Sequence, residues 1–335
     1  MDTLTHGVLG ACLGELLGGR QLGRKALLAG AIAQNLPDAD VVCALWLDPA
    51  ANVLAHRGLT HSFFFAVLIT PLLAYGLTQW RYSVAPFSFW LKFLGAQIFV
   101  HDLMDGFNAY GTGWFEPFSH LRVSFHTLFV SDPLFFIPLV LGTGYLLLAG
   151  NQQPRRNWYA GLALGASGLY LAGCVWVKER VYKDVAAAIS KQELVQDNYL
   201  ITPTPFNSLL WFITTKHDSG SWVGYRSVWD RHPDIHFEFF PRNDSLLQPL
   251  TRTKEIENLR RFSQGYYTVE QSGDTLVWND LRFGQMMGWQ HPRTGFVFHY
   301  YLAPEIDNTV VLQRGRFAGW DETTLHNLIS RIRGR

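Results

Sequence analysis

The sequence predicts an α-helical, polytopic membrane domain followed by a small, mainly antiparallel β domain of the α+β type. Charged residues make up only 16 % of the 335-residue chain, while 48 % are hydrophobic and 15 % aromatic; a soluble globular protein has about 25 % charged residues. Nearly all long uncharged stretches lie before residue 178. From residue 199 onward, apolar and polar residues alternate with the period of two that is typical of β-strands.

Two short apolar segments open the chain. Residues 7–19 and 26–36 are each too short to cross a hydrocarbon core of about 30 Å, and a polar stretch, 20–25, joins them. We expect a helical hairpin that is half-inserted in the membrane or packed against its spans. No secretory signal is predicted, because no positive charge precedes the first apolar segment and Glu15 interrupts it.

Four later segments are predicted membrane spans, because each is long enough to cross the core as a helix and has at most one charged residue. They are residues 62–79, 82–100, 133–149 and 158–177. The alternative for each segment is a buried helix of a large soluble core. Tryptophans near the span ends are typical of an interfacial belt.

The chain therefore divides into three predicted regions: a membrane domain over 1–177, a connector helix over 178–198 and a soluble β-rich domain over 199–335. The connector contains strong helix formers in Val185-Ala-Ala-Ala-Ile189. Strands are expected at 236–240, 275–283 and 295–301, and a surface helix at 321–333.

Composition also excludes some functions. The 28 Lys and Arg residues balance 27 Asp and Glu residues, which leaves a net charge of +1 and no basic field to attract nucleic acid. The three cysteines are scattered and form no CxxC pair, so the sequence indicates neither a disulfide framework nor a thiolate zinc site.

Histidine and aspartate residues gather at the ends of the predicted spans. If the chain crosses the membrane at each span, these residues lie on one side of it, and both ends of the hairpin can return to the same place. The hairpin contributes His6, Asp38 and Asp40, and the span ends contribute His56, His61, His101, Asp102, Asp105, His126 and Asp132. Ionisable groups at a membrane boundary are costly unless they are solvated, paired or metal-bound.

The spacing of these residues indicates a metal site. His101 and Asp105 are four residues apart, which places an imidazole and a carboxylate on one helix face. His56 and His61 do not share a helix face, and Gly58 indicates a loop, with Thr60 capping the helix that follows. The alternative for Asp38 and Asp40 is a solvated turn in which Asp38 caps a helix.

A cluster of His and Asp without cysteine suits Zn, Mn or Fe in a hydrolytic role, and zinc is the preferred assignment. The candidate ligands for one or two ions are His6, Asp38, Asp40, His56, His61, His101, Asp105 and His126. Asp132 is the candidate general base, and Asp102 a group that orients an imidazole. Arg57 favours an anionic substrate group, with contact to a lipid headgroup as its alternative role.

These residues resemble the YdjM-like, LexA-regulated family of inner-membrane proteins, described as membrane-bound metal-dependent hydrolases. The resemblance covers about residues 1–175 and extends to residues 203–211. The matching motifs are Thr5-His6-Gly7, Pro37-Asp38-Ala39-Asp40, His56-Arg57-Gly58-Leu59-Thr60-His61-Ser62 and His101-Asp102-Leu103-Met104-Asp105. The family implies a metal-dependent hydrolase embedded in the membrane, and membership does not settle the substrate.

A looser similarity is to the zinc-dependent phospholipase C and single-strand nuclease group, which orders its ligands as His, Asp, His, HxxxD and His. The corresponding residues here are His6, Asp38 or Asp40, His61, His101 with Asp105, and His120 or His126. That group binds metal through an N-terminal Trp and closes with HxxxE, whereas here Met1 is the first residue and Val130 stands four residues after His126. We therefore expect one or two ions rather than three.

The sequence thus predicts a hydrolase of a bacterial inner membrane that activates water against a phosphoester, or another ester, of a lipid-type substrate. Membrane lipids are the expected partners, and nucleic acid is not. An ion-coupled transporter and a non-catalytic scaffold with a structural metal are the alternatives. Following the predicted crossings, the β domain returns to the side of the metal cluster, and the balance of Lys and Arg around the spans favours the cytoplasmic side.

Overall fold

The computed structural model describes residues 1–80, 83, 85–150, 155–194, 198–250, 253–302, 317 and 319–335. Contacts within the chain divide it into two compact units. The first contains residues 1–46 and 55–174, and the second contains residues 47–54 and 175–335. Residues 82 and 84, at the start of the second predicted span, and residues 195–197 of the predicted connector lie outside the described residues.

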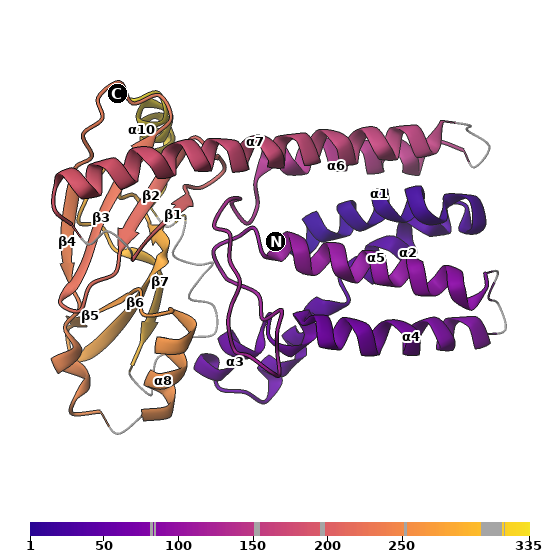
Figure 1. The fold of residues 1–335 in the computed structure, drawn as a ribbon, viewed down its shortest axis with the longest axis horizontal. Helices are drawn as coiled ribbons and strands as arrows, with labels where there is room; N and C mark the ends of the chain where they lie inside the picture. Colours follow the sequence, from indigo (N-terminus) through magenta and orange to yellow (C-terminus); the bar gives the residue numbers. More distant parts are fainter. Residues whose placement is uncertain are drawn as a thin grey trace. The chain divides into compact units, whose positions relative to one another are not determined.

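The first unit is helical (Figure 1). Its elements, with the short helix α3 that leads back into it, are α1 (Thr3–Leu22), α2 (Lys25–Gln34), η1 (Pro37–Leu45), α3 (Pro49–Ala55), η2 (Leu59–His61), α4 (Phe63–Gln79), α5 (Phe87–Asp105) and α6 (Pro133–Leu148), where η marks a 3₁₀-helix. Side chains cap three of the helices, because Asp2, Ser62 and Asp132 accept hydrogen bonds from backbone N–H groups of the first turns of α1, α4 and α6. Ser62, and not the predicted Thr60, is therefore the cap of α4.

Helices α1 and α2 form the predicted helical hairpin. Glycines let the two backbones touch: a Cβ atom on Gly30 would overlap the carbonyl oxygen of Gly10, and one on Gly14 would overlap that of Ala26. Such contacts between small residues are typical of helix pairs in membranes. Gln97 of α5 donates to the carbonyl oxygen of Gly10 at 3.1 Å, which ties α5 to the hairpin.

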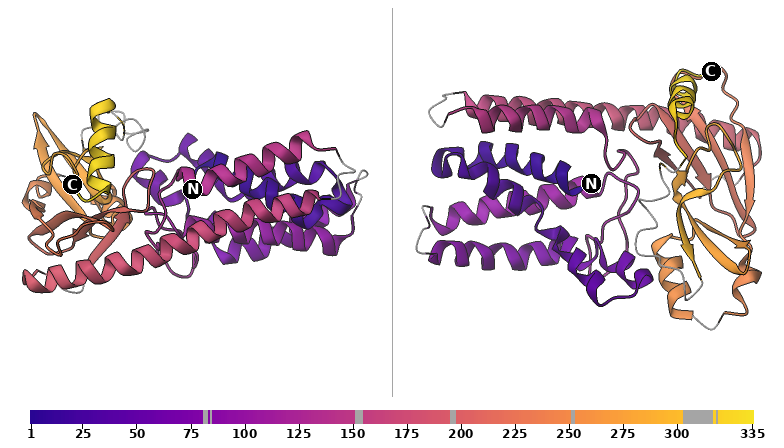
Figure 2. Two further views of the ribbon diagram at one scale, coloured as in Figure 1. Left: turned by 90° about the horizontal axis from the view of Figure 1, so that it is seen from above. Right: turned by 180° about the vertical axis from the view of Figure 1, so that it is seen from behind.

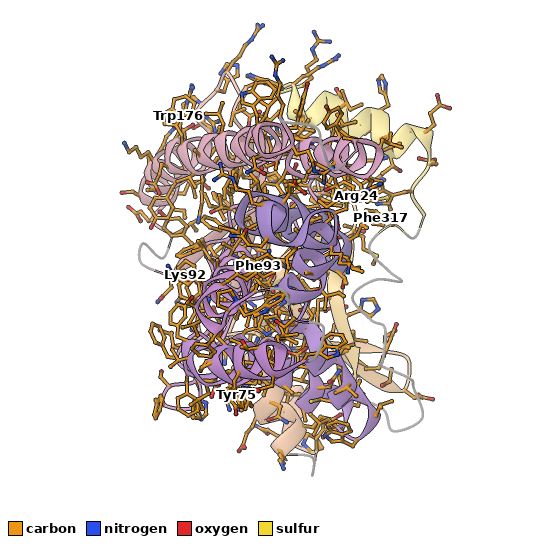
Figure 3. All side chains as sticks on the ribbon, turned by 90° about the vertical axis from the view of Figure 1, so that its right-hand side faces the viewer. Arg24, Tyr75, Lys92, Phe93, Trp176 and Phe317 are labelled. Atoms are coloured by element: carbon orange, nitrogen blue, oxygen red, sulfur yellow. The ribbon has the colours of Figure 1, made fainter. Side chains whose placement is uncertain are left out.

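The first unit has an apolar interior and an apolar exterior. Viewed along the helices, Phe93 of α5 lies between them, while Tyr75 of α4 is on the outside (Figure 3). Phe93 is 1 % exposed, and Tyr75 is 60 % exposed, together with Val67, Leu68 and Leu72 of the same helix. An exterior of this kind suits contact with lipid better than contact with water.

The expected number of four spans is not confirmed. Among the described helices, α7 (Arg156–Lys191) alone is long and apolar enough to cross a membrane as one element. Residues Pro49–His61 and α4 pass the same test together, with a bend of 58° at their break, and α6 is apolar but shorter. Polar residues of the predicted second span, Ser88, Lys92 and Gln97, lie in α5 and lower its hydropathy.

Helix α7 joins the predicted fourth span and the predicted connector in one element. Residues 178–191 of the predicted connector are helical, and they continue the fourth predicted span without a break, because no Gly or Pro follows Gly173 before Lys191. The boundary between the two compact units lies inside this helix, between residues 174 and 175.

The second unit contains two antiparallel sheets, as the alternating pattern predicts (Figure 2). The first sheet has the order β1 (Tyr199–Pro203), β2 (Leu210–Thr215), β3 (Gly220–Ser227) and β4 (Phe237–Pro241), and the second has β5 (Tyr267–Ser272), β6 (Thr275–Gln285) and β7 (Phe296–Tyr301). The helical elements are η3 (Asp244–Leu247), α8 (Thr253–Phe262) and α10 (Glu322–Ile332).

The last turns of α7 cover the first sheet. Val181, Val185 and Ile189 pack on Trp211 and Ile213 of β2 in a buried core. The predicted closing helix is present as α10, which begins with a capping box between Asp321 and Thr324.

Candidate metal centre

Four elements of the first unit bring His and Asp side chains together at one end of its helices. The first turn of α1 supplies His6, η1 supplies Asp38 and Asp40, η2 supplies His61, and the last turns of α5 supply His101 and Asp105. His6, His61, His101 and Asp105 are fully buried, and the side chain of Asp38 is 14 % exposed. Burial of this many ionisable groups calls for a compensating partner.

Asp38, His61, His101 and Asp105 form a group whose ligand atoms all lie within 4.8 Å of one another. The Nε2 atoms of His61 and His101 are 3.1 Å apart. Asp38 Oδ1 lies 3.3 Å from His61 Nε2 and 3.6 Å from His101 Nε2. Asp105 Oδ2 lies 3.5 Å and 3.7 Å from the same two atoms. Two ligands of one tetrahedral zinc ion are about 3.3 Å apart, so these distances fit one ion.

The hydrogen bonds of His101 fix which ring nitrogen faces the group. Its Nδ1 lies 2.5 Å from the backbone carbonyl oxygen of Gln34. A carbonyl oxygen only accepts, so Nδ1 carries the proton and the neutral ring presents the Nε2 lone pair to the other ligands. Metal-binding imidazoles are commonly oriented in this way.

His61 is oriented by a relay of two further side chains. Thr60 Oγ1 donates to Asp40 Oδ2 at 2.8 Å, and its oxygen lies 3.1 Å from His61 Nδ1. The threonine proton is committed to the carboxylate, so His61 Nδ1 donates to Thr60 and Nε2 again carries a lone pair. When both rings are neutral, the Nε2 lone pairs of His61 and His101 face each other at 3.1 Å, an arrangement that repels unless a proton or a metal ion lies between them.

The orphaned oxygens of the group support the same assignment. Asp38 Oδ1 and Asp105 Oδ2 are buried and accept no hydrogen bond from any described residue. Carboxylate oxygens that accept no hydrogen bond are costly to bury; the Arg57 guanidinium compensates Asp105 in part, and a divalent cation would stabilise both oxygens. The residues present therefore fit a divalent metal ion.

Asp40 is not one of the four ligands in the first group; it accepts hydrogen bonds from residues that surround and position that group. Its Oδ1 accepts from His56 Nδ1 at 2.8 Å, and its Oδ2 accepts from the backbone N–H of Arg57 at 2.9 Å as well as from Thr60. Asp38, Asp40 and His56 form a second group that could hold an ion. In that group, Asp40 and His56 are already bonded to each other.

Asp38 and Asp40 stay ionised at neutral pH. Burial alone would raise the pKa of both carboxyl groups. Interaction with His61, and for Asp40 also with His56, outweighs burial and holds each pKa well below its usual range. Both side chains are therefore anionic, as metal ligands or their supports must be.

His6 lies at the edge of the group. Its ring stacks on His101 with centroids 3.8 Å apart, and its Nε2 lies 3.1 Å from Asp105 Oδ1. The nitrogen of Met1 contacts the same oxygen. His6 and Met1 are thus close enough to steer Asp105.

Arg57 is buried beside the group and held on every side. Its Nε lies 3.2 Å from Asp105 Oδ2, and its other nitrogens donate to Asn108 Oδ1 and to the carbonyl oxygen of Met1. The guanidinium also lies over the ring of Tyr110, 4.5 Å from its centroid. Arg57 offsets the negative charge of the carboxylates, and its burial does not suit the contact with a lipid headgroup that was the alternative.

Asp102 is fully buried next to His101 but belongs to neither group. Neither of its carboxylate oxygens has a hydrogen-bond partner among the described residues. It does not orient an imidazole through a hydrogen bond in this structure, which corrects that expected role.

Three sequence candidates lie elsewhere. Asp132 caps α6 and accepts from Tyr170 Oη at 2.9 Å. His120 is exposed and pairs with Glu116 at 2.9 Å. His126 follows in the α5–α6 loop with a positive φ of 43°. None of them belongs to the two ligand groups found among the described residues. The prediction that every His and Asp at a span end converges on one site is therefore wrong. Asp132 instead serves as the N-cap of α6.

Several supporting residues were missed by sequence reasoning: Gln34, Asn108 and Tyr110, together with the relay role of Thr60. Gln34 acts through its backbone, which no side-chain motif reveals. The HRGLTH motif did contain Thr60 and Arg57, and its fixed spacing was the available signal.

A model of the YdjM inner membrane protein family matches residues 1–181, which is more than half of the chain. The chain belongs to the YdjM family of inner membrane proteins. The matched range includes every residue of the two ligand groups described above. The predicted family and the predicted inner-membrane location are therefore confirmed.

Two curated relatives match the chain, and the name of the first agrees with the inner-membrane assignment. The chain is 35 % identical to inner membrane protein YbcI of Escherichia coli strain K12 over 121 residues, which cover 36 % of this chain and 69 % of YbcI. It is 28 % identical to protein YfhP of Bacillus subtilis strain 168 over 231 residues, or 65 % of this chain and 66 % of YfhP. The matches thus span about two thirds of each relative. No solved structure matches the chain, and the similarity to zinc-dependent phospholipase C is not shown.

Proposed function

We propose that this YdjM-family protein is a membrane-embedded, metal-dependent hydrolase that cleaves a phosphoester or other ester of a lipid-type substrate. The observation that carries the proposal is the pair of Nε2 atoms of His61 and His101, 3.1 Å apart, flanked by buried oxygens of Asp38 and Asp105 that accept no hydrogen bond from the described residues. Hydrogen bonds fix both rings before any ion binds, which is how metal sites are usually prepared.

The donor set favours one ion held by Asp38, His61, His101 and Asp105. A second ion at Asp38, Asp40 and His56 would have to displace the 2.8 Å hydrogen bond between Asp40 and His56. A bound divalent ion would supply an acidified water and neutralise charge on the ester oxygen. Zinc suits these nitrogen and oxygen ligands, and Mn or Fe would be accepted by the same set.

The chain's own residues have distinct tasks in this proposal. Thr60 and Asp40 keep His61 in the required tautomer, and the Gln34 carbonyl oxygen does the same for His101. Arg57 balances the charge of Asp105. Asp38 has the most exposed side chain of the four ligands, at 14 %, so a substrate group reaches the cluster over this residue.

Apolar side chains around Asp38 support a lipid-type substrate. The same 3₁₀-helix, η1, exposes Val41 and Leu45, and the next residue, Trp46, is also exposed; Leu45 is 80 % exposed. These surfaces would hold the acyl part of an amphiphile while its ester group approaches Asp38.

A structural metal in a non-catalytic scaffold is the second candidate. Four protein ligands fill a tetrahedral zinc ion, and closed sites of this kind are structural, whereas catalytic sites keep one position for water. The deep burial of three of the four ligands favours this alternative.

Metal content tests both candidates. Detergent-purified wild type should contain about one equivalent of metal by elemental analysis, and His101→Ala and Asp105→Ala should lose it while remaining folded. His120→Ala is the matched control, because that exposed imidazole bonds only to Glu116 among the described residues. Metal-free wild type, or metal retained in both site variants, would refute the centre.

Cobalt substitution separates the hydrolase from the scaffold. A hydrolase should show a cobalt visible spectrum that changes with added anions or pH, because one position exchanges, and it should release product from short-chain phosphoester or carboxylester lipids. A spectrum that is insensitive to both, with no turnover, would leave the scaffold as the function.

A further inference from the structure

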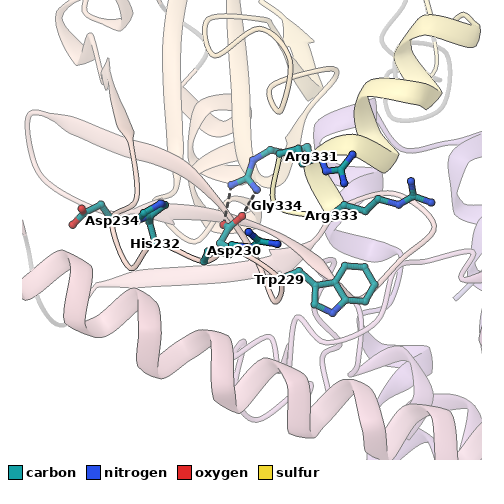
Figure 4. Close-up of a pocket in the computed structure, with 9 residues that line it drawn as sticks. Trp229, Asp230, His232, Asp234, Arg331, Arg333 and Gly334 are labelled. Carbon is teal, nitrogen blue, oxygen red and sulfur yellow. Dashed lines mark hydrogen bonds and ion pairs between the residues drawn. The ribbon is translucent and has the colours of Figure 1, made fainter.

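The second unit contains a basic pocket, of about 770 Å³, in a part of the chain remote in sequence from the ligand groups. It is lined by Trp229, Asp230, Arg231, His232, Asp234, Arg331, Arg333, Gly334 and Arg335 (Figure 4). We propose that this pocket binds a phosphate group, carried either by an anionic lipid headgroup or by a small soluble phosphate compound. The inference does not depend on the proposed hydrolase.

The pocket is built where the end of α10 packs on the loop after β3. Arg331 forms a two-point ion pair with Asp230, at 2.6 and 3.0 Å. Gly334 adopts a φ of +73°, and a Cβ atom there would lie 2.6 Å from the carbonyl oxygen of Trp229. A glycine is required for this close approach, so the lining is a defined structure and not a chance collection of surface side chains.

Both acidic side chains that line the pocket are already paired. Asp230 is bound by Arg331 and lies 3.8 Å from Arg226, and Asp234 is bound by Lys191 at 2.7 Å. Arg226 is itself paired with Asp184 of α7 at 2.9 Å. These carboxylates therefore do not neutralise the remaining cations.

Three guanidinium groups are left over. Arg231, Arg333 and Arg335 are exposed and have no ion-pair partner among the described residues. Figure 4 shows Arg333 and the indole of Trp229 on the same side of the Arg331–Asp230 pair. Three like charges around one hollow repel one another, and an anion relieves that repulsion.

The residue types select phosphate among anions. Guanidinium groups bind phosphate oxygens through two parallel hydrogen bonds, and several of them can share one phosphate. The pocket volume lies within the usual range for sites of small ligands, about 300–1,000 Å³. Trp229, which is 53 % exposed, offers an apolar face to the carbon part of the ligand.

The test is calorimetric titration of the full chain in detergent, with a chelator present so that a metal at the His/Asp cluster does not contribute. The probes are inorganic phosphate, glycerol 3-phosphate and dihexanoyl phosphatidylglycerol, with dihexanoyl phosphatidylcholine as the zwitterionic comparison. In wild type we expect saturable binding of at least one anionic probe. The triple variant Arg231→Gln, Arg333→Gln and Arg335→Gln should bind it at least tenfold more weakly.

A second triple variant controls for net charge: Lys183→Gln, Lys254→Gln and Arg293→Gln remove three exposed cations of the same unit outside the pocket. Its affinity should stay within twofold of wild type, and all three proteins should have the same circular dichroism spectrum. Preference for the lipid probe would identify a headgroup, and preference for the other two a soluble phosphate compound. Absence of binding, equal weakening in both triple variants, or equal competition by a polyglutamate peptide would overturn the proposal.

Discussion

Thr60 determines which ring nitrogen of His61 donates a hydrogen bond, although Thr60 is not one of the four ligands. Because its hydroxyl donates to Asp40, it can only accept from His61, and this directs the His61 Nε2 lone pair toward His101. A single hydroxyl group therefore sets the chemistry of the neighbouring imidazole.

Replacement of Thr60 by Val keeps the side-chain shape and removes the relay. We expect metal affinity to fall about tenfold, since loss of an outer hydrogen bond of this type costs 10–100-fold. Competition with a chromophoric chelator measures the change. Thr78→Val, which removes a hydroxyl that donates to a backbone carbonyl in α4, should leave affinity unchanged; equal affinity in the two variants would contradict the relay.

Glu15 and Arg156 form a buried ion pair in the first unit. Arg156 donates from two nitrogens to the two Glu15 oxygens at 2.8 and 2.7 Å, and also to the carbonyl oxygens of Leu146 and Ala149. The sequence analysis treated Glu15 as an interruption of an apolar segment. In the structure it joins α1 to the end of α6 and the start of α7.

Glu15→Ala should destabilise the protein by about 3 kcal/mol, because removal of one partner leaves Arg156 buried and unpaired. Thermal unfolding in detergent, followed by circular dichroism, measures the loss. The double variant Glu15→Leu with Arg156→Met should recover much of the stability, since apolar residues of similar volume can replace a buried pair. A single variant as stable as wild type would show that the pair contributes nothing.

At the scale of elements, the α1–α2 hairpin brings the start of α1, with His6, and the end of α2, with Gln34, to the ligand group. Gly10, Gly14 and Gly30 allow the two helices to touch along their backbones. This contact, together with the bond from Gln97 to Gly10, sets the depth at which α5 presents His101 and Asp105. Helix packing here is therefore a condition for the site and not only for stability.

Gly30→Ala should destabilise the first unit by about 2 kcal/mol, within the cost range of overpacking, because its methyl group overlaps the Gly10 carbonyl oxygen. Metal content should fall with stability. Gly144→Ala in α6 is the matched control, since a Cβ atom there meets no atom within 4 Å, and it should be neutral or slightly stabilising. Identical melting of both variants would argue against close packing of the hairpin.

At the scale of the whole molecule, the two compact units carry different chemistry. Every residue of both ligand groups lies in the first unit, and every residue that lines the basic pocket lies in the second. A ligand stabilises only the state that binds it, so ligand effects should be local to one unit.

Metal addition should accordingly raise hydrogen-exchange protection in the first turn of α1, in η1, in η2 and at the end of α5. Binding at a hundredfold excess over the dissociation constant stabilises the bound unit by about 2.7 kcal/mol. Strands β1 to β7 should keep their exchange rates. Mass spectrometry of deuterated peptides measures both, and equal protection of the strands would mean that the two units respond as one.

The sequence by itself determined the helical membrane unit, the β-rich second unit, the hairpin and the core of the ligand group. Those features depend on local signals: apolar runs, alternation with period two, and the four-residue spacing of His101 and Asp105 on one helix. The HRGLTH motif included His61, which lies with His101 in the group that could hold an ion.

Only the tertiary structure decided which candidates meet. Asp132 and His126 also stand at segment ends, but Asp132 bonds to the backbone of α6 and neither residue belongs to a ligand group. The pairing of Glu15 with Arg156, and the pocket formed by α10 and the loop after β3, join residues about 100 or more positions apart. Such contacts depend on how elements pack in three dimensions, and neither local spacing nor composition encodes the distance between side chains that are remote in the chain.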